Sequence, residues 1–285
     1  MLATAIPITA ACLFVGLVLL ERCLPLRKET RSLWRRLGVN ITVSCLALAV
    51  AAFVVKPAAS SVMGSGSSQI GVLGLVNAPS WIEAIIGFLL LDLTFYYWHL
   101  LNHKVGFLWR FHNVHHIDPD LDVSTAFRFH LGEVGLSAII RVLQVTLIGM
   151  SVETYLVYEL AFTANTIFHH SNVRLPIRVE RWLNLILVTP RMHGIHHSQV
   201  KQETNSNYSV VLPWWDWLHR SLRLNVPQDR IKIGVPGYAR PEDNTLWSVL
   251  TLPFRHQRDY WKSEGDQPVN QEASSSSANQ STLAE

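Results

Sequence analysis

Three histidine clusters are the residues of this sequence whose types and spacing suit chemistry. On an α-helix, residues three and four positions apart lie on one face, so a cluster with that spacing can direct two or more imidazoles to one point. Imidazole is the commonest side-chain ligand of metal ions. We therefore predict metal binding by the members of the three clusters, which are His99 and His103, then His112, His115 and His116, and then His193, His196 and His197.

The repetition of the pattern argues against an accidental origin. The sequence holds 13 histidines among 285 residues, and both of the later clusters read His-x-x-His-His. One such motif would be weak evidence, whereas two copies with a further pair are strong evidence. The clusters also supply more nitrogens than the roughly four to six ligands that one ion takes. The sequence therefore predicts a centre with two metal ions.

The remaining histidines are weaker candidates. His170 follows a long apolar stretch and His130 precedes it, so both are expected on the side of the clusters and are predicted as ligands. His169 is more typical of a packing position or a position around the ligands. His219 and His256 have no partner at helical spacing, so we expect them at the surface.

Other classes of metal protein fit the pattern less well. A zinc protease would need His-Glu-x-x-His, which is absent from the sequence. Haem in a membrane protein is held by single histidines near the middle of opposing helices. Zinc would suit the nitrogens but has no redox chemistry, and a transporter would carry its ligands along a path through the membrane. Two iron ions that react with O₂ fit best.

The composition indicates that membrane helices position these histidines. Hydrophobic residues make up 49% of the sequence and charged residues 16%, and a net charge of +3 does not favour nucleic-acid binding. We predict spans over 3–20, 37–55 and 81–101, the first as an anchor rather than a signal peptide. A further apolar stretch, 133–168, forms either two crossings or a re-entrant hairpin. The predicted fold is an all-α integral membrane protein with about four transmembrane or re-entrant helices and a cytosolic histidine-rich cap.

Charge predicts the sidedness. Residues 21–36, between the first two spans, hold six basic residues, whereas residues 56–80, predicted as a loop rich in Gly and Ser, hold only Lys56. Short basic loops stay in the cytoplasm. We therefore expect the N-terminus outside, and the histidine clusters and the C-terminus in the cytoplasm.

Residues 81–225 resemble the fatty acid hydroxylase and sterol desaturase superfamily. The similarity rests on the following motifs: Asp92-x-x-x-Tyr96-Tyr97-Trp98-His99-x-x-x-His103, Leu108-Trp109-Arg110-Phe111-His112-x-x-His115-His116, Arg128-x-His130-x-x-Glu133, His170-Ser171-Asn172, Thr189-Pro190-Arg191-Met192-His193-x-x-His196-His197, Asn205-Ser206-Asn207-Tyr208 and Trp215-Asp216. Membership implies a histidine-bound di-metal centre at the cytosolic membrane face and O₂-dependent hydroxylation or desaturation of a lipid that enters from the bilayer. The chain departs from the family pattern at 218–221, where members often read Phe-Gly-Thr.

Two carboxylates are predicted to support the ligands. Asp92 lies seven residues before His99, two helical turns back on the same face, and Glu133 lies in the third motif, so we predict both as hydrogen-bond partners of ligating histidines. For Glu133 the alternative is an ion pair with Arg128 or Arg141. The sequence has no dinucleotide, flavin or fused haem motif, so electrons are expected from a separate reductase, ferredoxin or cytochrome b5-type donor.

The predicted division of the chain has four parts. These are a membrane hairpin and loop over 1–80, a catalytic domain over 81–225, a membrane-peripheral segment over 226–261 and a disordered tail over 262–285. A monooxygenase of ether lipids or carotenoids on the same scaffold, and a non-catalytic membrane metal-binding protein, are the alternative functions.

Overall fold

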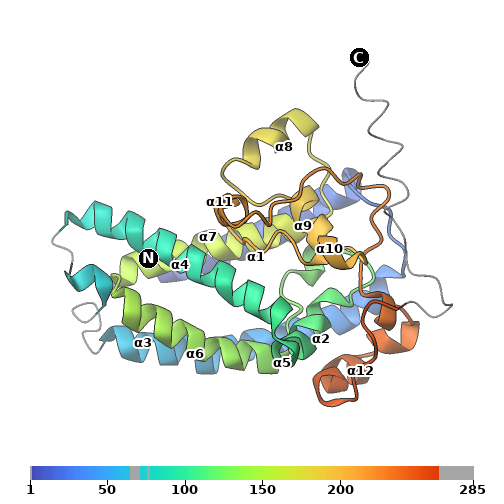
Figure 1. Cartoon of the computed structure of the whole chain (residues 1–285), viewed down its shortest axis with the longest axis horizontal. Coiled ribbons are helices and arrows are strands. Elements are labelled where there is room, and N and C mark those ends of the chain that lie inside the picture. Colours follow the sequence, from blue (N-terminus) through green and yellow to red (C-terminus); the bar gives the residue numbers. More distant parts are fainter. Residues whose placement is uncertain (1, 65–70, 76–77, 263–285) are drawn as a thin grey trace.

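All regular secondary structure is helical in the residues that the computed structural model describes, which are 2–64, 71–75 and 78–262 (Figure 1). In this part of the chain, extended pairing is limited to two isolated bridges, Pro25 with Val173 and Ser198 with Ile233. Four helices have the length and composition to cross a membrane: Ile6–Cys23, Leu33–Gly64, Ser80–Lys104 and Leu131–Ile148. The predicted all-α membrane fold is confirmed.

The second span is longer than the sequence indicates. After α1 (Leu2–Cys23), α2 (Leu33–Val50) continues through a π-helical turn (Ala51–Val55) into α3 (Lys56–Gly64). The prediction of a loop over 56–80 is therefore wrong for its first nine residues. Pro57 lacks an N–H group, and the wide turn immediately before it accommodates that loss without ending the helix. Packing of α3 on α6 then buries Ala59.

The next two helices carry the first two histidine clusters. α4 (Ser80–Lys104) is a long span that ends with His99 and His103, and α5 (Gly106–His116) carries the second cluster. Val105 between them has an extended backbone, with φ −94° and ψ 111°, which ends α4 and turns the chain. The two clusters therefore lie close together at one end of the span.

A helical hairpin returns the chain to the same end. It consists of α6 (Leu131–Ile148) and α7 (Val152–His170), joined by a turn at Gly149, whose φ of +72° is left-handed. Inside the hairpin, Arg141 of α6 pairs with Glu159 of α7 at 2.6 Å. The predicted break near 149–151 is confirmed, and α6 has the character of a membrane span.

Short helices cover the histidine-bearing ends of the long ones. In Figure 1, α5, α10 and α12 gather at one end of α4 and α6. Arg36 of α2 holds this cap in place through Asp118 and Asp122, each at 2.8 Å. The short α-helices are α8 (Ile177–Leu183), α9 (Pro190–His196), α10 (Lys201–Thr204), α11 (Trp214–Leu218) and α12 (Leu246–Thr251). Apart from Lys262, the predicted tail lies outside the described residues.

Candidate metal centre

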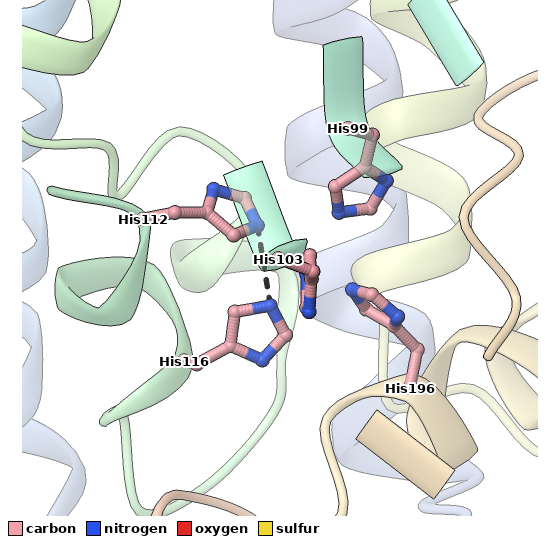
Figure 2. Close-up of side chains that lie close together, drawn as sticks. All are labelled: His99, His103, His112, His116 and His196. Carbon is pink, nitrogen blue, oxygen red and sulfur yellow. Dashed lines mark hydrogen bonds between the residues drawn. The ribbon is translucent and has the colours of Figure 1, made fainter. Parts of the chain in front are cut away.

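Nine histidines form two groups whose ring nitrogens converge. In each group one nitrogen per residue lies within 4.8 Å of the others, and Figure 2 shows the rings of the first group pointing toward one another. The first group is His99, His103, His112, His116 and His196, and the second group is His115, His170, His193 and His197.

The two His-x-x-His-His motifs divide their members between the groups. On α5, His112 and His116 belong to the first group, and His115 belongs to the second. Side chains at positions i and i+4 differ by only about 40° around a helix, whereas position i+3 lies about 60° to the other side. The i and i+4 pair therefore belongs to one group, and the i+3 side chain points to the neighbouring group.

The third cluster makes the reverse assignment. His193 and His197 belong to the second group, and His196 belongs to the first. The groups are adjacent, because the rings of His116 and His197 stack with centroids 4.3 Å apart. The two helices thus build a pair of neighbouring sites.

The distances between ring nitrogens suit a metal ion. In the second group the Nε2 atom of His170 lies 3.0 Å from those of His115 and His193. A neutral imidazole carries one N–H, so such a set cannot all be paired by hydrogen bonds. Two nitrogens bound at about 2.1 Å and at right angles around one ion lie about 3.0 Å apart.

Backbone carbonyls orient several of the rings. The Nδ1 atoms of His99 and His170 donate to the carbonyl oxygens of Tyr208 and Thr166, each at 2.7 Å. His196 Nδ1 donates to the carbonyl oxygen of Ser206, also at 2.7 Å. A proton on Nδ1 leaves the Nε2 lone pair free for an ion, as is usual for metal-binding histidines.

Several buried nitrogens have no hydrogen-bond partner among the described residues. They include both ring nitrogens of His103 and the Nε2 atom of His196. A buried polar atom without a partner costs roughly 1–3 kcal/mol, so native structures rarely keep one. Coordination to a metal ion would satisfy these atoms.

Burial keeps the imidazoles of the third cluster neutral. It lowers the pKa of His193 and His197 well below the ordinary value, and neighbouring histidines lower it further. Burial also lowers the pKa of His196 to about 3. Neutral rings present lone pairs at physiological pH without competition from protons.

Comparison with known proteins identifies the family. Residues 84–221 match the family model described as fatty acid hydroxylase. This part of the chain belongs to the fatty acid hydroxylase family. The predicted resemblance is confirmed, and the fatty acid hydroxylase region contains both histidine groups.

Three relatives are similar to parts of the chain. Ornithine lipid hydroxylase OlsE from Rhizobium tropici is 29% identical over 56% of this chain and 47% of its own length. Human alkylglycerol monooxygenase is 30% identical over 50% of this chain and 31% of its own length. Human cholesterol 25-hydroxylase is 29% identical over 47% of this chain and 49% of its own length. The matches thus span about half or less of these relatives. No solved structure matches the chain.

His130 lies outside both groups of the fatty acid hydroxylase region. Its Nδ1 atom accepts from the backbone N–H of Gly132 at 2.9 Å, and its Nε2 atom donates to the carbonyl oxygen of Leu250 at 3.1 Å. Backbone groups therefore occupy both nitrogens, so the prediction of His130 as a metal ligand is wrong. Its side chain instead caps the N-terminus of α6. His169 is buried against His193, with ring centroids 4.1 Å apart, and also lies outside the groups.

Asp92 has different partners from those predicted. It accepts from the backbone N–H of Leu212 at 3.0 Å and from Trp215 Nε1 at 2.8 Å. Seven residues of helix span about 10 Å, too far for its carboxylate to reach the His99 ring, and the Nδ1 atom of His99 is bound to the Tyr208 carbonyl. Asp92 therefore ties the segment around α11 to α4. The prediction that it is a hydrogen-bond partner of a ligating histidine is wrong.

Glu133 has the predicted geometry. Its Oε1 atom accepts from His112 Nδ1 at 2.8 Å. Arg128 lies instead beside Asp118, at 3.6 Å, and Arg141 pairs with Glu159. Glu133 is thus the hydrogen-bond partner of a histidine of the first group, and it forms no ion pair with Arg128 or Arg141.

The remaining histidines are exposed, as expected. His256 lies on the surface, and so does His219 in the segment that departs from the family pattern. His219 nevertheless accepts from the Tyr97 hydroxyl at 2.8 Å and stacks on Tyr96. The departure therefore fits against α4 and contributes no residue to either histidine group.

Proposed function

We propose that this chain is a membrane-bound di-iron oxygenase that uses O₂ to hydroxylate a lipid drawn from the bilayer. The observation that carries the proposal is the pair of adjacent histidine groups, five and four residues in size, at one end of membrane-spanning helices. An all-nitrogen ligand set of neutral imidazoles suits ferrous iron.

Two bound iron ions would supply the activation of O₂ that an unactivated C–H bond requires. The chain's own residues hold and orient the centre. Tyr208, Ser206 and Thr166 fix three ring orientations through their carbonyl oxygens, and Glu133 fixes that of His112. Burial of the rings excludes bulk water, which protects a reactive centre from side reactions.

The names of the relatives support hydroxylation of a lipid. They are a hydroxylase of ornithine lipids, a monooxygenase of alkylglycerols and a hydroxylase of cholesterol. These substrates differ in their head groups but share an apolar body. We infer that a membrane lipid is the substrate and that hydroxylation, rather than desaturation, is the reaction.

A cleft gives an electron donor access to the first group. It has a volume of about 530 Å³ and reaches His103, the one member of that group that is only partly buried. Trp261 stacks on Trp109 in this cleft, with centroids 6.2 Å apart, and Trp109 lies 4.8 Å from the His103 ring. The exposed Lys104 and Lys201 line the cleft, which suits a donor protein with an acidic surface.

The test is isotope incorporation by purified protein in nanodiscs. The protein is loaded with ferrous iron and supplied with the host's extracted lipids, an electron donor and ¹⁸O₂. A lipid that gains one ¹⁸O atom supports the proposal, and the His197→Ala variant should give none, whereas the exposed His256→Ala should equal wild type. A new double bond without ¹⁸O would mean desaturation, and turnover without O₂ would refute the oxygenase.

A further inference from the structure

Two short elements of the cap carry large apolar side chains on the outside. Trp182 of α8 and Trp217 of α11 are each 75% exposed. Soluble proteins rarely expose contiguous apolar patches of this kind without a binding role. The exposed members of this surface, which we call the α8–α11 surface, are Ile177, Val179, Trp182, Leu185, Ile186, Trp214, Trp217 and Leu218.

The α8–α11 surface is continuous. The indole Nε1 of Trp214 donates to the carbonyl oxygen of Leu185 at 2.7 Å. This bond joins the segment after α8 to the start of α11, although the two are far apart in sequence. Their apolar side chains therefore present one patch.

The position of α11 along α4 gives the depth of the patch. Trp215 and Leu212 both donate to Asp92, at 2.8 and 3.0 Å. Asp92 is the central residue of α4, twelve residues from Ser80 and twelve from Lys104. Twelve residues of helix span about 18 Å. The α8–α11 surface thus lies beside the body of a membrane span, not beyond its end.

The charges near the surface suit lipid head groups. Arg174, Arg178 and Arg181 lie on or just before α8, and all three are exposed. Basic side chains that flank Trp and Leu are typical of helices that lie in a membrane interface, where long cationic side chains reach up to the phosphates. Tryptophan itself concentrates at that level.

We propose that the α8–α11 surface is immersed in the leaflet on the side of the histidine groups, between the head groups and the acyl chains. The depth of this surface beside α4 and the arginines that flank it indicate that lipid covers it. The cap then rests in the bilayer through this surface, in addition to its attachment to the spans. This inference depends on the fold alone and stands apart from the proposed oxidation chemistry.

Spin-label accessibility tests the proposal on the full chain in nanodiscs. The exposed native cysteines Cys12, Cys23 and Cys45 are first replaced by Ala. A nitroxide is then attached in the Trp217→Cys variant and, as a matched water-exposed control, in Glu242→Cys. Relaxation by O₂, which concentrates in lipid, is compared with relaxation by a water-soluble nickel chelate.

We expect the label at position 217 to be relaxed by O₂ and shielded from nickel, as a site below the head groups would be. The label at position 242 should show the reverse. Equal nickel access at both positions would overturn the proposal, and so would shielding of position 217 from both reagents, which would mean that protein covers the patch. If Trp217→Cys does not fold, Trp182→Cys gives the same test.

Discussion

At the scale of single residues, His103 and His130 lead to opposite expectations for metal content. Both ring nitrogens of His103 are buried without a partner among the described residues, whereas both of His130 bind backbone groups. We expect His103→Ala to lose metal and activity. His130→Ala should retain metal and lose about 0.5–2 kcal/mol of stability through the α6 cap. Elemental analysis and thermal unfolding in detergent separate the two, and equal metal loss in both variants would contradict the assignment.

Glu133 and Asp92 form a second matched pair. Replacing Glu133 by Gln weakens the acceptor of His112, and loss of such a partner lowers metal affinity by about 10–100-fold. Asp92→Asn should keep wild-type affinity and unfold at lower temperature, because it weakens the bonds to Leu212 and Trp215. Titration with a metal-binding dye measures both affinities. An unchanged affinity in Glu133→Gln would mean that this carboxylate is only structural.

Residue types and positions along the chain were sufficient to find every member of both groups, and helical spacing explains why each His-x-x-His-His motif is divided. Which group each part joins depends on how α5 and α9 are rotated in the folded cap, which local sequence does not encode. The carbonyl oxygens that orient the histidine rings could not be predicted from sequence either, since every residue has a carbonyl oxygen. Asn207 between two of them adopts a left-handed conformation with φ 55°, which Asn tolerates better than most residues.

At the scale of elements, the turn between α6 and α7 depends on glycine. A Cβ atom on Gly149 would lie 2.8 Å from the Cα atom of Gly71, and the residue already has a positive φ. We expect Gly149→Ala to destabilise the protein by at least about 1 kcal/mol. The matched control is Gly135→Ala in the second turn of α6, where nothing lies within 4 Å and alanine favours the helix by about 1 kcal/mol. Thermal unfolding in detergent should move in opposite directions, and a neutral Gly149→Ala would show that the turn is not closely packed.

The helices themselves were largely predictable, because apolar length marks a span and Gly149 marks a break. The failure was at 56–64, where Pro57 and the small polar residues after it favour a loop by composition. The structure keeps the helix because α3 packs on α6 and buries Ala59. Packing between helices distant in sequence decided the outcome against local propensity.

At the scale of the whole molecule, the basic cleft makes a prediction about electron transfer. Replacing both Lys104 and Lys201 by Glu should weaken binding of an acidic donor and remove most of its salt dependence. Metal content and reduction by dithionite should be unchanged. Lys28→Glu with Lys232→Glu, a pair that lines a different pocket, serves as the control. Donor saturation curves at two salt concentrations measure the effect. An equal loss of donor affinity in both double variants would mean that the donor does not bind at this cleft.

Sidedness is the last expectation, and it follows from two features taken together. Residues 21–36 hold six Lys or Arg, which predicts a cytoplasmic position for this segment. The structure ties the same segment to the histidine-bearing cap, since Arg27 donates to Gln228 at 2.7 Å and Arg36 pairs with Asp118. The cap must then lie on the same side of the membrane as the basic segment.

We therefore expect a fluorescent protein fused after Trp261 to be active, because it matures in the cytoplasm, and alkaline phosphatase at the same position to be inactive. Phosphatase inserted at Ser67, a position outside the described residues, should give the reverse. An active phosphatase after Trp261 would place the cap outside. The charge argument and the supply of electrons from a cytoplasmic donor would then fail together, while the metal-binding groups, which depend only on the geometry of the cap, would stand.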